Sequence, residues 1–204
     1  SMAVINFAFV AATLGFSSVL LPNQLTLIDE ANKVANLALV TSVSMISSIV
    51  LTPLIGAISD RTRSRWGRRA PWLALGGLLL VASFTGLAFA QSVVLILALA
   101  TLMQIGAATF SAPVAAIIAD RYAVEKRGLV SGFIGLGLNV GYAFGVLIAA
   151  TLAFNLQLAY VTFAIGVAVI LLGFLLVARD TSSKSMPLEP FSFKTFVVSF
   201  WINP

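Results

Sequence analysis

The feature that most constrains the fold of this chain is a series of six long apolar stretches that contain no Asp, Glu, Lys or Arg. About 20 apolar residues in a helix cross the roughly 30 Å hydrocarbon core of a bilayer. A strand of a membrane barrel needs only about 10 residues and alternates in polarity. The stretches therefore predict an all-α membrane protein with six transmembrane helices. They cover residues 3–21, 36–58, 71–90, 93–118, 128–154 and 158–178.

The composition argues against a soluble enzyme. Charged residues make up 9% of the chain, against about 25% in an ordinary soluble domain. The sequence contains no His and no Cys, so it offers no imidazole base, no thiol nucleophile and no soft metal ligand. We therefore predict that the chain is not an enzyme and needs neither a metal nor another cofactor.

The positive charges are distributed unequally between the two sides of the predicted bundle. Segments after the second, fourth and sixth stretches hold Arg61, Arg63, Arg65, Arg68, Arg69, Arg121, Lys126, Arg127, Arg179, Lys184 and Lys194. The other connecting segments hold only Lys33. Because Lys and Arg accumulate in cytoplasmic loops, this bias predicts a multi-pass protein of the cell membrane with both termini in the cytoplasm.

The densest charge lies in the segment ISDRTRSRWGRRAPW, residues 58–72. An arginine-rich loop can bind nucleic acid, but a loop held between two membrane helices is a poor candidate for that role. Contact with anionic lipid headgroups and simple retention on the cytoplasmic side both account for the arginines. Neither accounts for Asp60 and Gly67, or for Gly56 four residues before Asp60 on the same helical face.

Two motifs carry a resemblance to a known family. Gly56, Asp60, Arg61, Gly67, Arg68 and Arg69 resemble the loop 2–3 signature of the major facilitator superfamily. The version from Ser59 to Trp72 is similar to the sucrose and glycoside–cation symporter branch, which commonly has a third Arg where Ala70 stands. A second group resembles the loop 4–5 pattern of the superfamily: Asp120, Arg121, Glu125, Arg127, Gly128, Ser131 and Gly132.

The resemblance implies twelve helices in two six-helix halves, of which this chain holds the first. We expect residues 1–178 to form one six-helix domain of two inverted three-helix repeats. Residues 179–204 read as a cytoplasmic linker that ends in an interfacial helix. Transport would then require a second six-helix half or a homodimer. The resemblance also implies that Asp60 bridges to the other half and closes the cytoplasmic side, although it could merely cap its helix or balance its arginine neighbours.

Polar residues are concentrated in four of the six stretches. The second stretch has seven Ser, Thr, Asn or Gln residues, the first and fourth have four each, and the fifth has three plus Tyr142. The third and sixth have two and one. Polar side chains in membranes tend to face protein or a watery cavity, so the first, second, fourth and fifth helices are predicted to surround a cavity. The superfamily resemblance implies the same partition.

Spacing within these helices indicates candidate solute contacts. On the first helix, Asn6, Thr13, Ser17 and Gln24 share a face if the helix continues past Pro22. Further stripes are Thr41, Ser44, Ser48 and Thr52; Thr101, Gln104, Ala108 and Ser111; and Ser131, Gly135, Asn139 and Tyr142. Ser and Thr can instead bond to carbonyls of their own helix, and the amides can instead bond between helices. We predict polar solute contacts from Asn6, Gln104, Asn139 and Tyr142, with Phe16 and Phe110 as apolar walls.

Gly137, Gly141 and Gly145 form a separate stripe on the fifth helix. Glycine at this spacing favours close helix packing, and the alternative is a flexible hinge.

These features favour transport of a small polar solute, most simply a sugar or glycoside, by alternating access. No carboxylate lies within the six stretches, so this half supplies no intramembrane proton relay or anionic Na⁺ site. Coupling could come from a second half, the protein could be a uniporter, or the symporter branch could be the wrong one. The competing hypothesis is a half that transports nothing alone, such as a fragment or a membrane assembly partner.

Overall fold

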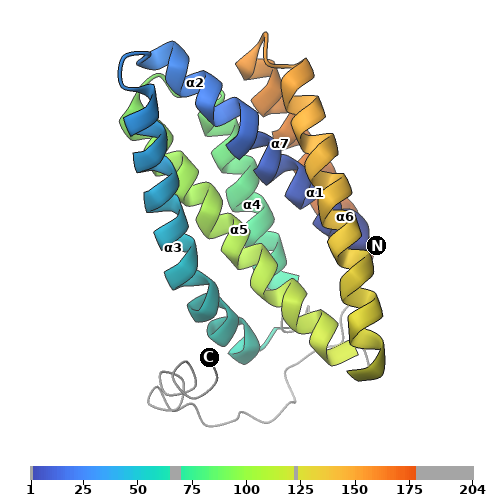
Figure 1. Cartoon of the computed structure of the whole chain (residues 1–204). Coiled ribbons are helices and arrows are strands. Elements are labelled where there is room, and N and C mark those ends of the chain that lie inside the picture. The colour runs from blue at the N-terminus through green and yellow to red at the C-terminus, as the bar shows by residue number, and fades with distance from the viewer. Residues whose placement is uncertain (1, 65–69, 122–123, 178–204) are drawn as a thin grey trace.

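The computed structural model describes residues 2–64, 70–121 and 124–177, and the elements in that part of the chain are all helical (Figure 1). They are α1 (Met2–Gly15), the π-helix η1 (Phe16–Leu20), α2 (Leu21–Ile28), α3 (Lys33–Arg61), α4 (Ala70–Leu87), α5 (Val93–Arg121), α6 (Val124–Thr151) and α7 (Leu156–Val177). Because α1, η1 and α2 run on without a break, these elements form six helical rods. The predicted all-α, six-helix architecture is confirmed.

Five of the six rods are long and apolar enough to cross a membrane: Phe7–Ile28, Lys33–Ser59, Ala70–Leu87, Val93–Ser111 and Leu156–Gly173. In α6 the apolar part found by the same criteria, Gly135–Thr151, is shorter. The first rod continues through Pro22 and ends at Ile28, seven residues beyond the predicted end at 21. The predicted linker, residues 179–204, lies outside the described residues.

Two pairs of packed helices agree with an inverted repeat, whereas the extensive α4–α5 contact has only a minor counterpart between α7 and the first rod. The extensive contacts are α1 with α6, α3 with α5, α4 with α5, and α4 with α7. If the first three rods correspond to the last three, the first rod matches the fourth and the second matches the fifth. The α1–α6 and α5–α3 pairs then exchange, as two related three-helix units require. Figure 1 shows α3 and α6 on opposite sides of the bundle, with α4 and α5 between them.

The core lies between the first rod, α4, α5 and α7. Phe16 packs at its centre, with ring centroids 6.2 Å from Phe84 and 6.2 Å from Tyr160. By contrast, α3 and α6 contribute one fully buried residue each to this core, Val40 and Ala149. The two outer helices therefore keep most of their surface outside the core.

Glycines allow α1 and α6 to touch backbone to backbone. A Cβ atom on Gly15 would lie 2.6 Å from the carbonyl oxygen of Gly145, and one on Gly141 would lie 2.9 Å from that of Phe7. A Cβ on Gly145 would collide with the backbone of Ala11. The predicted close packing is thus confirmed for Gly141 and Gly145, whereas a Cβ atom on Gly137 would meet no atom of the described residues within 4 Å outside its own helix.

Candidate solute-binding site

Polar side chains from four helices lie at one depth in the bundle. Ser17, Ser44, Gln104 and Asn139 are each 11 or 12 residues from the helix end that faces away from the arginine-rich loop. At a rise of 1.5 Å per residue this places them about 17 Å from that end, near the middle of a membrane roughly 30 Å thick. We call these four residues the polar layer. They come from the four helices that the sequence assigned to the cavity.

The amides of the polar layer keep much of their hydrogen-bonding capacity. Asn139 is exposed and donates one hydrogen bond, 2.8 Å long, to the Gly135 carbonyl of its own helix. Gln104 is half-buried and has no hydrogen bond to any residue that the structure describes. Tyr142 lies one turn from Asn139 and is 43% exposed. Asn139 and Tyr142 therefore lie at the surface of the described helices and Gln104 partly so, and solute contact by these three residues stays a prediction.

Ser44 is the unusual member of the polar layer. It is 5% exposed, and its hydroxyl has no hydrogen-bond partner among the described residues. The hydroxyl of Thr41, one turn earlier, instead donates a 2.7 Å hydrogen bond to the Leu37 carbonyl, which is the common arrangement in a helix. Ser44 lies on α3, whose main packing partner is α5. A buried polar group without a partner is rare and marks a place where a water or a solute group can bind.

Most other stripe hydroxyls bond to their own helix, which is the simpler of the two arrangements open to Ser and Thr. Each donates to a carbonyl three or four residues earlier: Thr13, Ser17, Thr41, Thr52, Thr101 and Ser111. Their oxygens can still accept a hydrogen bond from a solute.

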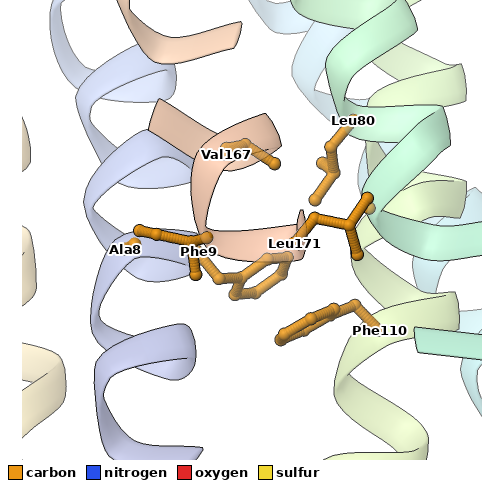
Figure 2. Close-up of a pocket in the computed structure, with 8 residues that line it drawn as sticks. Ala8, Phe9, Leu80, Phe110, Val167 and Leu171 are labelled. Carbon is orange, nitrogen blue, oxygen red and sulfur yellow. The ribbon is translucent and has the colours of Figure 1, made fainter. Parts of the chain in front are cut away.

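The two predicted aromatic walls point into the protein. Phe16 is 2% exposed at the core centre, and Phe110 is 4% exposed and stacks on Phe9 with ring centroids 4.8 Å apart. Figure 2 shows Phe9 and Phe110 beside Leu171 around an apolar cavity of about 20 Å³. Residues of α1, α4, α5 and α7 line it, and none of them offers a side-chain hydrogen bond. Both rings are buried among apolar residues, and this cavity does not suit a polar solute.

The remaining predicted positions are Asn6 and the residues of the two loop motifs. The side chains of Asn6, Asp60, Asp120, Arg121, Glu125 and Arg127 lie outside the part of the chain that the structure describes, as do Gly67, Arg68 and Arg69 entirely. Gly56 is half-buried on α3 and Arg61 is exposed at its end. The Trp72 indole N–H donates 2.7 Å to the Thr62 hydroxyl, so the described flanks of the arginine-rich loop are joined directly.

Gln24 does not lie on the polar stripe predicted from its spacing. In a continuous α-helix it would share a face with Ser17, but Ser17 is exposed and Gln24 is 6% exposed. The π-helix between them explains the difference. The Leu21 N–H donates to the Phe16 carbonyl, a turn that encloses one additional residue and rotates the rest of the rod by about 100°. The predicted stripe is therefore wrong beyond Ser17.

Gln24 instead joins three helices inside the core. Its amide nitrogen donates a 2.9 Å hydrogen bond to the carbonyl of Leu87, the last residue of α4, and a 3.1 Å hydrogen bond to the carbonyl of Ala90 just beyond it. Its amide oxygen accepts a 2.6 Å hydrogen bond from the Tyr160 hydroxyl of α7. The Leu87 carbonyl, at the end of α4, also accepts a 3.2 Å hydrogen bond from the Ala90 N–H, so Gln24 adds a second bond there and a bond to Ala90 in the turn that follows. We call these four residues the Gln24 cluster. A lone Tyr inside an otherwise apolar stretch was the sequence signal for it.

The loop between α2 and α3, outside the membrane, carries a carboxyl group with a lowered pKa. Hydrogen bonds from the side chains of Asn32 and Asn36, and from the Asn32 backbone, hold the pKa of Asp29 below its ordinary value of 3.8. The Asn36 bond is 3.0 Å long and links the end of α2 to the first turn of α3.

Six packed hydrophobic rods with a neutral polar layer at mid-depth define a multi-pass membrane protein with the fold of half a transporter. The chain belongs to the Major Facilitator Superfamily, whose sequence model matches residues 3–204. That family consists of transporters rather than enzymes. This match shows the superfamily and does not distinguish the sucrose and glycoside–cation symporter branch from its other branches.

Two relatives illustrate the similarity. Over 50 residues the chain is 56% identical to an uncharacterized symporter, sll1374, of Synechocystis sp., a match covering 23% of this chain and 9% of the symporter. The fold is similar to a crystal structure of the peptide transporter POT, a mutant in complex with alafosfalin. The TM-score is 0.64 at 18% identity, covering 98% of this chain and 44% of the transporter. The chain thus spans less than half the length of either protein.

Proposed function

We propose that this chain is the amino-terminal half of a secondary transporter that moves a small neutral polar solute, a sugar or glycoside, by alternating access. The observation that carries the proposal is the polar layer. It supplies hydroxyl and amide groups at mid-membrane depth with unused hydrogen-bonding capacity and without charge. Neutral donors and acceptors suit a solute rich in hydroxyl groups, since each solute hydroxyl both donates and accepts.

The polar layer needs a second surface opposite it, because a solute at mid-membrane is transported only between two walls that open in turn. A second six-helix half supplies that wall in our proposal. A second copy of this chain is the other possibility, related by a twofold axis along the membrane normal. In either arrangement the arginine-rich end faces the cytoplasm, as the charge bias predicts.

Uptake of a labelled disaccharide into liposomes tests the proposal, with this chain reconstituted alone for the twofold dimer and together with a second six-helix half for the other arrangement. We expect uptake that falls about tenfold or more in Gln104→Leu and Asn139→Leu, since each removes an amide from the polar layer at a cost of about 1–3 kcal/mol. Gln157→Leu, at an exposed amide near the start of α7, is the matched control and should transport normally. An excess of unlabelled dipeptide should not compete.

Uptake that survives both polar-layer substitutions would contradict the proposal, because the polar layer would then have no part in solute binding. Absence of uptake by this chain alone, with an intact-particle mass of a single chain in detergent, would exclude the twofold dimer as the second wall. Absence of uptake with the second half present as well would favour the competing hypothesis of a half that does not transport.

A further inference from the structure

The first rod is attached at its two ends to different parts of the bundle. At one end, α1 is fixed to α6 by the backbone contacts at Gly15, Gly141 and Gly145. At the other, α2 is fixed to α4 and α7 by the three hydrogen bonds of Gln24. Backbone contact through glycine and a satisfied buried network both hold their helices in one arrangement.

The segment between these attachments is the π-helix η1, Phe16–Leu20, the only non-α turn within the described helices. Pro22 comes directly after Leu21 and has no N–H to donate to the Ser18 carbonyl, so one backbone bond of an α-helix is missing there. On the inner side Phe16 and Leu20 pack at 2% and 0% exposure, and on the outer side Ser17 and Ser18 are exposed. The segment is thus supported on one side and unobstructed on the other.

A small unfilled space of about 20 Å³, room for about one water molecule, lies beside α1. The apolar cavity in Figure 2 lies between α1, which contributes Ala8 and Phe9, and the facing residues of α4, α5 and α7. The nearly parallel Phe9 and Phe110 rings, at an interplanar angle of 16°, meet across flat faces. Unfilled space at this interface means that α1 forgoes contacts there that would otherwise hold it.

We propose that η1 is a pivot about which the α1–α6 pair moves as one body against α2, α4 and α7. The Gln24 cluster keeps the far end of the rod stationary, and the cavity beneath Phe9 accommodates the displacement of α1. Kinks and π-turns are where helices absorb such changes. This inference goes beyond the proposed function and does not depend on the identity of the solute, because it concerns only two rigid bodies and the segment joining them.

Distances between paired spin labels test the pivot, and the cysteine-free chain needs no background substitution. The 204-residue chain in lipid nanodiscs would carry labels at Leu27→Cys on α2 and Leu136→Cys on α6, positions 77% and 63% exposed. The control pair, Leu27→Cys and Phe89→Cys, spans only the Gln24 cluster. We expect the α2–α6 distance distribution to be about twice as broad as that of the control pair.

Two further variants test whether η1 causes the breadth of the α2–α6 distance distribution. Deletion of Ser18 removes the additional residue of the π-turn and should narrow the α2–α6 distribution to that of the control pair, while Ser18→Ala should leave it broad. Ala8→Val fills the cavity and should also narrow it, which decides the matter if the deletion does not fold. An α2–α6 distribution as narrow as the control in the unmodified chain, or one that stays broad in both the deletion and Ala8→Val, would overturn the pivot.

Discussion

Replacement of Gln24 by leucine should destabilise the bundle more than any single polar substitution on its surface. Leucine has a similar size but makes none of the three hydrogen bonds, and it leaves the Tyr160 hydroxyl buried without a partner. Interhelical hydrogen bonds in membrane proteins average about 0.6 kcal/mol, and an unsatisfied buried group costs about 1–3 kcal/mol. We therefore expect Gln24→Leu to lower the free energy of unfolding by about 2–4 kcal/mol.

Tyr160→Phe separates the parts of this effect. It removes only the 2.6 Å bond to the Gln24 amide oxygen and leaves both carbonyl contacts in place. We expect a loss of about 1 kcal/mol, and a coupling energy of about 1 kcal/mol in the double-mutant cycle with Gln24→Leu. Reversible unfolding in mixed detergent micelles, followed by loss of helical circular dichroism, measures all four proteins. Gln157→Leu, an exposed amide, is the control and should change stability by less than about 0.5 kcal/mol.

The result that would refute this reasoning is additivity. If the two substitutions add without coupling, or if Gln24→Leu costs no more than the control, the Gln24 cluster does not hold α2, α4 and α7 together. The proposed pivot would then lose its fixed end as well.

Three further predictions concern other parts of the chain. Gly145→Ala should lower the free energy of unfolding by about 1–3 kcal/mol because its Cβ meets the α1 backbone, whereas Gly137→Ala, at a site with open space, should be neutral or slightly stabilising in the same assay. Asp29 has a lowered pKa in the folded protein. Its contribution to folding stability is therefore complete above the unfolded pKa of 3.8 and is lost as the pH falls through the lower folded pKa. Melting temperatures between about pH 6 and about pH 3 should therefore fall less steeply in Asp29→Asn, and an identical slope would contradict this. In sealed cells an impermeant thiol reagent should label Gln91→Cys and spare Ser64→Cys, and the reverse pattern would invert the orientation.

The membrane-spanning architecture could be predicted because hydrocarbon imposes a simple rule on sequence. Six uncharged stretches of sufficient length correspond to six helical rods, and the glycine spacing on α6 correctly indicated close packing at Gly141 and Gly145. Both inferences depend on properties of single residues: their hydrophobicity and their size.

The details of the first rod could not be predicted, because they depend on a backbone irregularity that hydrophobicity does not encode. A pattern with a 3.6-residue period places Gln24 beside Ser17, and a single π-turn moves it into the core. The sequence offers Phe16 as an apolar wall, whereas the direction of its ring depends on contacts with Phe84 and Tyr160 from distant parts of the chain. Pro22 indicates an irregular helix at this place in the sequence, but it does not predict that the irregularity is a π-turn.

The neutrality of the polar layer has an energetic consequence for the whole transporter. Moving one elementary charge across a membrane yields or requires about 2.3 kcal/mol per 100 mV of membrane potential. Ser17, Ser44, Gln104 and Asn139 carry no charge, and the six apolar stretches contain no Asp, Glu, Lys or Arg. In the proposed transporter, the side chains within these stretches therefore carry no charge through the electric field when this half reorients. Voltage would drive the proposed transport only through a charge borne by the solute, a coupling ion or the opposite wall.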